Sequence, residues 1–534
     1  MLQFMIIGSI IIITCILSNK IASRFGIPML LAFIVLGMLF GSEGIFKIPF
    51  DNFWLAENIC TLALVCIIFY GGFNTRWDVA RPVIGKALLL SSAGTIITAL
   101  ITGVLCHIAL RVTLLEGMLL GAVLSSTDAA SVFNILRSRN LSLKYNTDSL
   151  LEVESGSNDP FAYTLTILLL SAMKTGETIS LRDIFLTATS QILLGLLVGG
   201  LVALISRWFL KKISFEASGF EAVFMLAVAM LAYALPTVIG GNGYLSAYLV
   251  GIILGNSSIG NKKGLVNFFD GLTSLMQMMI FFMLGLLSYP SRIFAVWFMG
   301  LMTALFLTLI ARPLATALLL SPLKVPFRQQ VVISWAGLRG AASIVFAIIV
   351  SVNGAVLEND LFHVVFCVVL LSLLLQGTLL PWFSGKLNMI NESGNVLMTF
   401  NDYTEEMDVH YISLPIAEGH PWIAKSVREL ELPPQTLLIF IKRKGKNVIP
   451  NGDTIIDIGD VLVLSALAYI DENDIRLREI RISLTNRWCN RRIRELDIPP
   501  NTLIILIQRG NETIIPDGNT MIHVGDLVIM NSVR

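Results

Sequence analysis

Charged residues are scarce in this chain of 534 residues. Asp, Glu, Lys and Arg make up 14 % of it, whereas soluble globular proteins contain about 25 %. The scarcity is confined to residues 1–389, where 23 Lys and Arg and 17 Asp and Glu occur. In the remaining residues the charged fraction is more than twice as high. We therefore expect a membrane domain over 1–389, a linker over 390–400 and a soluble tail.

Other absences argue against whole classes of protein. The net charge of +1 provides no basic surface for nucleic acid. The six cysteines form no CxxC pair and no histidine cluster accompanies them, so we interpret them as reduced packing residues rather than metal ligands. The amino terminus lacks a basic segment and a small-residue cleavage site, so residues 1–20 predict a retained helix rather than a signal peptide.

Long apolar segments fill the first 389 residues and predict about thirteen membrane-spanning helices. Their centres lie near residues 10, 35, 64, 97, 125, 161, 198, 228, 250, 276, 306, 340 and 372. The alternate connecting loops carry sixteen Lys and Arg on one side and five on the other. Because positively charged loops stay in the cytoplasm, this bias predicts an external amino terminus and a cytoplasmic tail.

Five ionisable residues remain inside the predicted spans once the loops are subtracted: Asp128, Glu154, Asp159, Arg312 and Arg339. A charge at the centre of a bilayer costs at least about 2.5–3.5 kcal/mol on insertion scales, so these residues require an explanation. Fixed ion pairs that hold helices together are one explanation. A path for ions is the other, and the surrounding sequence favours it.

The sixth span contains the sequence ESGSNDP, which begins at Glu154. At about 1.5 Å per residue, Asp159 lies roughly 16 Å into this helix and so near the bilayer midplane. Ser155 and Asp159 are four residues apart and share one helix face, whose hydroxyl and carboxylate oxygens suit a hard monovalent cation. Glu154 lies on an adjacent face, where it can pair with a buried arginine. Pro160 removes one backbone hydrogen bond from the helix interior, which is tolerated where a helix lines a cavity.

Two further spans are interrupted by polar or small residues. The fifth contains LSSTDAAS, residues 124–131, and the twelfth contains WAGLRGAAS, residues 335–343. Two interrupted spans seven apart are typical of inverted-repeat transporters, whose broken helices present partly charged half-helix ends inside the membrane. Asp128 and Arg339 have the signs needed to offset such ends.

Four motifs in this order resemble the NhaP-type branch of the monovalent cation:proton antiporters over essentially the whole membrane domain. They are SSTDAASVF, LEVESGSNDPFA, ARP and AGLRGAAS, which begin at residues 125, 151, 311 and 336. The resemblance implies thirteen helices, divided between a dimerisation domain and a core domain with two crossed, broken helices. It also implies a homodimer in the lipid bilayer of the bacterial inner membrane.

The resemblance assigns roles to the buried residues as well. Asp159 is expected to hold the cation and the proton in turn, with Asn158 beside it in an Asn-Asp motif. Arg312 matches the buried partner of Glu154, and Arg339 matches the arginine of the second broken helix. Relatives with an Asp-Asp pair move net charge, so Asn158 favours electroneutral exchange. The expected ion-binding set is Asp159, Asn158, Ser155, Glu154, Thr127 and Asp128.

These observations predict a secondary active antiporter that exchanges cytoplasmic K⁺ or Na⁺ for H⁺ and needs no cofactor. A single carboxylate binds either a proton or a cation, so the two ions compete for one group. A ligand-gated cation channel controlled by the tail is the alternative, although no segment resembles a selectivity filter such as TVGYG. An enzyme is not expected, because Glu154 and Asp159 point about 140° apart on a helix.

The tail is a tandem repeat. At an offset of 66 residues, 421–464 aligns with 487–530 without gaps, and 18 of 44 positions are identical. Alternating apolar residues between Gly-containing turns predict short strands after a brief helix near 425–431. We therefore expect a duplicated α+β module, over 401–470 and 475–534.

Each copy resembles the carboxyl-terminal lobe of regulator-of-potassium-conductance (TrkA-C) domains, through RELxxPPxTLxI, IPxGxT and GD. This resemblance favours K⁺ as the cation, regulation of exchange by the tail, and dimerisation. Such lobes bind cyclic di-AMP in some bacteria, and an assembly module without a ligand is the alternative here. No GxGxxG precedes either copy, so a Rossmann lobe for NAD or ATP is not expected.

Overall fold

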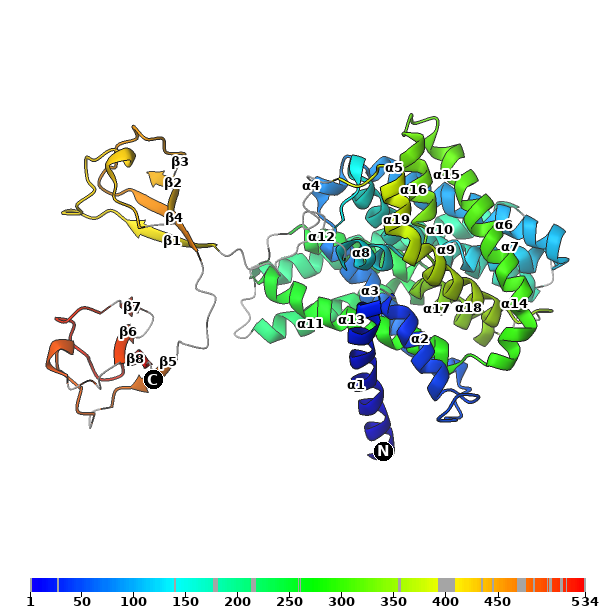
Figure 1. Ribbon diagram of the computed structural model, residues 1–534, viewed down its shortest axis with the longest axis horizontal. Helices are drawn as coiled ribbons and strands as arrows, with labels where there is room; N and C mark the ends of the chain where they lie inside the picture. The colour runs from blue at the N-terminus through cyan, green and yellow to red at the C-terminus, as the bar shows by residue number, and fades with distance from the viewer. Residues whose placement is uncertain are drawn as a thin grey trace. The chain divides into compact units, whose positions relative to one another are not determined.

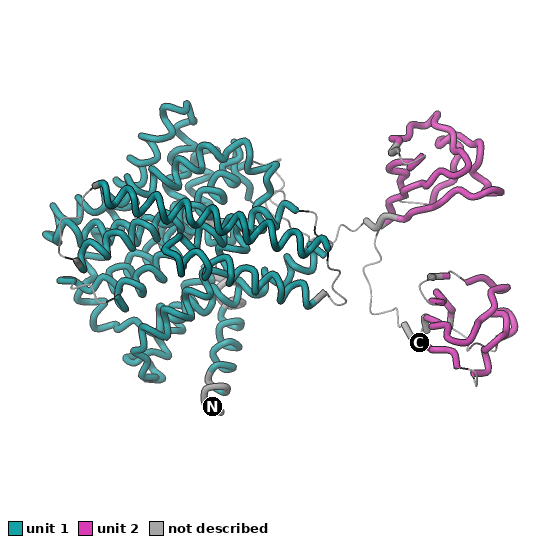
Figure 2. The backbone as a smooth tube through the Cα atoms, turned by 180° about the vertical axis from the view of Figure 1, so that it is seen from behind, with its two compact units in different colours: residues 1–403 teal, residues 404–534 magenta. Residues whose placement is uncertain are grey.

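The computed structural model divides into two compact units, Met1–Tyr403 and Thr404–Arg534 (Figure 2). The residues that it describes are 2–25, 28–138, 141–175, 181–212, 218–257, 259, 261–353, 357–391, 409–433, 436–443, 446–467, 477–483, 486–496, 498, 502–509, 512–514 and 516–532. The predicted linker over 390–400 lies outside these ranges from residue 392 onward.

The first unit is built of helices (Figure 1). They are α1 (Leu2–Phe25), α2 (Met29–Phe40), α3 (Phe53–Asn74), α4 (Trp77–Ala80), α5 (Ile84–Leu89), α6 (Thr95–Leu110), α7 (Leu114–Val123), α8 (Ala129–Ser138), α9 (Thr147–Thr175), α10 (Leu181–Lys212), α11 (Ser218–Val238), α12 (Gly243–Gly255), α13 (Lys262–Leu286), α14 (Pro290–Leu305), α15 (Arg312–Leu320), α16 (Phe327–Trp335), α17 (Ala341–Val352), α18 (Leu361–Leu371) and α19 (Thr378–Lys386).

Every apolar segment predicted from the sequence is centred in a helix or in the break between two half-helices. Within the described ranges, seven helices are long and apolar enough to cross a membrane, and five shorter apolar helices accompany them. The helical membrane domain is thereby confirmed, while the number of thirteen spans stays a prediction.

Three helical spans contain a short π-helical segment, with the bounds Leu90–Gly94 (η1), Phe306–Ala311 (η3) and Ser372–Gly377 (η4). Such segments are rare and often occur at functional sites. Here η3 leads directly into Arg312, and η4 begins at Ser372, which contacts the second broken helix. They therefore adjoin the polar centre of the unit.

Two helical groups pack against each other in this unit. Helices α2, α3 and α10–α13 contact mainly one another, and so do α5–α7, α9, α14–α16, α18 and α19, while α17 joins the second group through α18 and contacts both groups. The first group is tightly packed, because a Cβ added at Gly72 of α3 would lie 2.3 Å from the Tyr248 carbonyl oxygen of α12. Helices α9 and α17 of the second group reach α3 and α12 or α13 of the first. The interrupted helices thus lie where the two groups meet.

The second unit contains two four-stranded antiparallel sheets with the same strand order, β1-β4-β2-β3 and β5-β8-β6-β7. The strands are β1 (Val409–Pro415), β2 (Leu437–Arg443), β3 (Lys446–Val448), β4 (Val461–Leu467), β5 (Leu477–Arg481), β6 (Thr502–Arg509), β7 (Glu512–Ile514) and β8 (Leu527–Ser532). Even the β-bulges recur at the offset of 66, between Leu438 and Phe440 and between Ile504 and Leu506. The predicted strands are confirmed, and the brief helix is a single 3₁₀ turn, Val427–Glu429.

Candidate functional site

The two broken spans cross at their unwound segments, 124–128 between α7 and α8 and 336–340 between α16 and α17. The Asp128 backbone N–H donates to the Leu338 carbonyl oxygen at 2.8 Å, which ties the segments together. Only glycine fits at position 340, because an added Cβ would lie 2.0 Å from an Asp128 carboxylate oxygen. The polar and small residues that interrupted the sequence pattern are therefore those that make the crossing.

Asp128 and Arg339 occupy the ends of the half-helices, as their signs predict. The Asp128 carboxylate accepts from the Ser131 backbone N–H at 3.2 Å and from its hydroxyl at 2.5 Å, so a negative charge lies at the start of α8. Arg339 Nη1 donates to the carbonyl oxygens of Ser125 at 2.9 Å and Ser126 at 2.6 Å, just beyond the end of α7. Each charge lies at the half-helix end that it stabilises.

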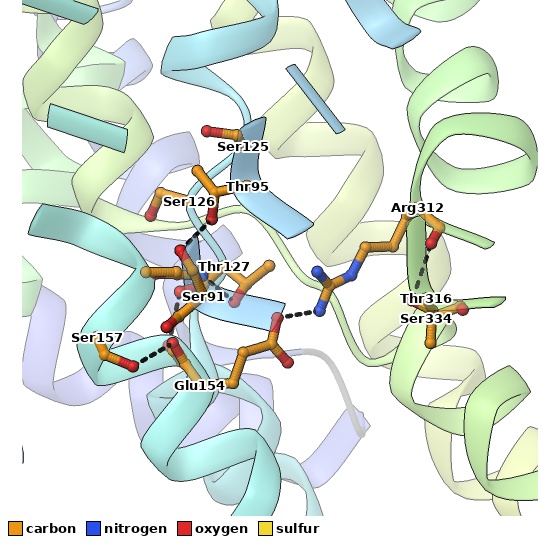
Figure 3. A network of polar contacts seen from close by, with 12 residues as sticks. Ser91, Thr95, Ser125, Ser126, Thr127, Glu154, Ser157, Arg312, Thr316 and Ser334 are labelled. Atoms are coloured by element: carbon orange, nitrogen blue, oxygen red, sulfur yellow. Dashed lines mark hydrogen bonds and ion pairs between the residues drawn. The ribbon is translucent and has the colours of Figure 1, made fainter. Parts of the chain in front are cut away.

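Glu154 of α9 forms an ion pair with Arg312 at the start of α15. Figure 3 shows the two side chains pointing toward each other across the space between these helices. Their exposed fractions are 0 % and 2 %, so both charges are removed from solvent. The pairing expected from the sequence is present, and each charge compensates the other.

Asp159 lies five residues further along α9 in different surroundings. One carboxylate oxygen accepts a hydrogen bond from the Ser126 hydroxyl in the first unwound segment. Asp159 forms no ion pair with any residue within the described ranges. Its side chain lines a cavity of about 290 Å³. The carboxylate is thus held in place without a permanent positive partner.

The remaining residues of the expected ion-binding set converge on the same segment. The Ser155 hydroxyl donates to the Thr127 carbonyl oxygen at 2.6 Å, and the Asn158 amide donates to the Thr127 hydroxyl at 2.6 Å. Of this set, Asp159, Ser155, Thr127 and Asp128 line the cavity. Asn158 lies behind Thr127, and Glu154 is occupied by its arginine, so neither is among the lining residues.

The cavity extends from the crossing in one direction only. Residues in the middle of α13 and at the start of α17 line it, and its other walls come from the start of α2, the second half of α3, α8 and the first half of α9. These helix ends adjoin the loops in which the sequence is rich in Lys and Arg. The walls add two further acidic residues, Glu152 and Asp270, to those already named. The cavity therefore provides an acidic path to Asp159 from the side with the basic loops.

Ser126, Glu152 and Asp270 were not expected at the site. Ser126 belongs to the polar run in the fifth span, but nothing in its sequence context indicates which helix its hydroxyl contacts. Asp270 of α13 also lies on the cavity wall. A signal for Glu152 existed in its spacing, since Glu152 and Asp159 are seven residues apart on α9 and share a helix face.

Comparisons with known proteins agree with this geometry. The family model described as "Sodium/hydrogen exchanger, transmembrane" matches residues 9–386, and the TrkA-C domain model matches 411–468 and 477–530. The K(+)/H(+) antiporter NhaP2 of Shewanella sp. (strain ANA-3) is 33 % identical over 515 residues, which cover 93 % of this chain and 88 % of that protein. The K(+)/H(+) antiporter NhaP of Alkalimonas amylolytica is 33 % identical over 477 residues, which cover 88 % and 82 %.

A solved structure gives the same result. The sodium proton antiporter MjNhaP1 from Methanocaldococcus jannaschii superimposes with a TM-score of 0.65 at 25 % sequence identity, covering 72 % of this chain and 99 % of that one. The resemblances to NhaP-type antiporters and to TrkA-C domains are thereby confirmed. The chain is a multi-pass membrane protein that belongs to the sodium/hydrogen exchanger family and carries two TrkA-C domains in its tail.

Proposed function

We propose that the protein is a secondary active antiporter that exchanges K⁺ or Na⁺ for H⁺ by alternating access, with both ions competing at Asp159. Relatives named as K(+)/H(+) antiporters and a structural neighbour named as a sodium proton antiporter support this reaction class. The observation that carries the proposal is the cavity at Asp159, a carboxylate held by a hydroxyl and, among the residues that the structure describes, by no arginine.

The chemistry of exchange follows from the single carboxylate. A carboxylate that is removed from water binds either a proton or a cation, so occupancy by one excludes the other. The oxygens of Ser155, Thr127 and Asp128 also line the cavity and supply the hard ligands that Na⁺ and K⁺ prefer. Because Asn158 is neutral and Glu154 is balanced by Arg312, Asp159 is the carboxylate of the ESGSNDP segment that is left for exchange. This arrangement supports electroneutral one-for-one stoichiometry.

The sidedness follows from the loop charges. The excess of Lys and Arg in alternate loops supports an external amino terminus, a cytoplasmic tail and insertion into the bacterial inner membrane. The cavity extends toward the helix ends that adjoin those basic loops. On this assignment, the conformation described here is open to the cytoplasm and admits the cytoplasmic cation.

The TrkA-C domains support regulation of exchange by the tail, and their occurrence favours K⁺ over Na⁺ as the cation. We expect the functional unit to be a homodimer. Truncation after Ser393 separates these contributions: it removes control by the tail and leaves the membrane domain, with Asp159, in place.

Transport in everted membrane vesicles tests the proposal. Addition of K⁺ or Na⁺ to vesicles with an acidified lumen is expected to dequench a pH-sensitive dye, and Asp159→Asn is expected to abolish the response. The control is Asp51→Asn, which makes the same change at an exposed position between α2 and α3. Exchange that persists in Asp159→Asn would contradict the assignment, and a cation current without coupled proton flux would identify a channel.

A further inference from the structure

Asn242 connects the two helical groups directly behind Asp159. It is the amino-terminal cap residue of α12 and is 1 % exposed. Its side-chain amide donates to the Pro160 carbonyl oxygen at 2.7 Å and to the Thr164 hydroxyl at 2.8 Å, both on α9. Its backbone N–H donates to the Gln191 carbonyl oxygen of α10 at 2.9 Å. One buried residue thus joins α10 and α12 to the helix that carries Asp159, through its backbone N–H and its side chain respectively.

The oxygen and the nitrogen of this amide bind different partners. The oxygen accepts from the Leu245 backbone N–H at 2.9 Å and so caps α12. The nitrogen makes both contacts to α9. Because the backbone N–H fixes the oxygen, the amide nitrogen must face α9, and its orientation follows from the hydrogen bonds. Capping and the contact with α9 are therefore separable by mutation.

The position of the contact along α9 is informative. The α9 residues on the cavity wall end at Asp159, and the residues that Asn242 holds, Pro160 and Thr164, come after it. Asn242 therefore forms its hydrogen bonds with α9 on the side of Asp159 opposite the cavity. Helices α9 and α12 are in direct contact.

We propose that Asn242 is a positioning residue that closes the site on the side opposite the cavity and must release α9 when the site opens there. This inference rests on the proposed function, because it assumes that α9 moves relative to α12 during exchange. A buried amide that loses its acceptors is costly unless water replaces them. Water that enters as the opposite side opens supplies that replacement. The contact therefore stabilises the conformation described here relative to the other.

The test uses a variant that keeps the cap and loses the contact. Serine is a good cap residue but is too short to reach Pro160 and Thr164 from position 242, so Asn242→Ser removes only the α9 contact. Thr164→Val removes one of the two acceptors at nearly constant volume. The matched control is Asn52→Ser, because Asn52 caps α3 through its side-chain oxygen and the Leu55 backbone N–H, also at 2.9 Å.

Two measurements report on the conformation. The first is the apparent KM for the cation on each side of the membrane, in vesicles of both orientations. The second is labelling by a membrane-impermeant maleimide of Ser274→Cys, an exposed position on the cavity wall. A background with Cys489→Ser suits this assay, because the other five cysteines are buried. Labelling does not depend on transport, so it stands even where the proposed exchange fails.

We expect Asn242→Ser to raise the apparent KM on the cavity side, to lower it on the opposite side, and to slow labelling about two- to tenfold. Thr164→Val should give a smaller change in the same directions, and Asn52→Ser none. If both α9-contact variants kept the KM values and the labelling rate of the natural protein, the proposal would be overturned. So would a loss of maximal rate alone, which indicates a purely structural role. If Asn242→Ser fails to fold, the Thr164→Val result decides.

Discussion

Glu154 and Asp159 lie on the same helix, five residues apart, but their surroundings differ. Glu154 is fully buried against Arg312, whereas Asp159 accepts a hydrogen bond from Ser126 and lies on the wall of a cavity. An arginine balances the first charge permanently. The second charge is left for an ion that arrives through the cavity. The comparison shows that a carboxylate inside a membrane protein takes its role from its partner rather than from its depth.

The tail repeats the Glu154 arrangement outside the membrane. Arg443 Nε donates to the Asp460 carboxylate at 2.8 Å, and Arg509 Nε donates to Asp526 at 2.9 Å, 66 residues later. Each carboxylate also accepts a backbone N–H of its own turn, at 2.9 and 2.8 Å. In both places an arginine fixes a buried carboxylate and thereby the connection between two elements.

The largest effect is expected from breaking the membrane pair. Glu154→Gln leaves Arg312 buried without its counter-charge and should lower the free energy of unfolding by about 3–5 kcal/mol. Denaturation of the purified protein in mixed micelles measures this loss. The double variant Glu154→Gln with Arg312→Gln should recover much of it, because no unpaired charge remains.

Asp159→Asn is the matched control on the same helix. It exchanges a carboxylate for an amide without stranding an arginine, so it should change the free energy of unfolding by less than about 1 kcal/mol. Equal destabilisation by Glu154→Gln and Asp159→Asn would remove the distinction between the two carboxylates.

A pH-dependent effect of intermediate size is expected in the tail. Hydrogen bonds from Arg443 hold the pKa of Asp460 below its ordinary value, and Arg509 does the same for the pKa of Asp526. The unfolded module therefore binds protons more readily than the folded one. This contribution is complete above pH about 4 and is lost as the pH falls through the lowered pKa.

Hydrogen exchange of the β2, β4, β6 and β8 amides in the full-length protein, corrected for intrinsic rates, measures this stability. Acidification should reduce protection in both modules. Asp460→Asn should destabilise its own module by about 1.5–3 kcal/mol at neutral pH and flatten the acid response of that module alone. An unchanged acid response in the Asp460→Asn module would show that the Arg443 pair does not set it.

The smallest effect is expected from removing the hydrogen bond between the Ser126 hydroxyl and the Asp159 carboxylate. Ser126→Ala removes the donor to the charged carboxylate and should weaken cation binding about two- to tenfold, as expected for one hydrogen bond. Ser125→Ala is the control, because the Ser125 hydroxyl donates to the Ala122 carbonyl oxygen of its own helix. Titration of the purified protein with K⁺ and Na⁺ compares the two. Equal affinities would mean that Ser126 does not hold the site.

The sequence was sufficient to predict the elements of the fold and the rare charges within them. Apolar segments located the helices, since a bilayer requires long apolar runs. The clusters around Asp128 and Arg339 located both breaks, although the polar ESGSNDP segment lies in α9, which is continuous over Thr147–Thr175. The offset of 66 residues predicted two equivalent modules in the tail.

The contact partners of these residues were harder to predict from the sequence. Spacing alone left Glu154 with either buried arginine, and the choice of Arg312 depended on a family resemblance. Ser126 contacts Asp159, which is 33 positions away in sequence, and Asn242 contacts Pro160, which is 82 positions away. Hydropathy locates helices along the chain but does not show which helices are neighbours in space. The brief helix predicted near 425–431 is one 3₁₀ turn, which begins at the capping box of Ser426 and Glu429 and ends at Leu430, whose backbone is extended. Contacts across helices thus required the structure.

Proton release on cation binding tests the central claim most directly. Purified protein in weakly buffered micelles is titrated with K⁺ or Na⁺ over a range of pH while a dye reports free protons. If the two ions compete at Asp159, about one proton should be released per cation bound, and none in Asp159→Asn. Cation binding without proton release in the natural protein, or unchanged release in Asp159→Asn, would contradict the account.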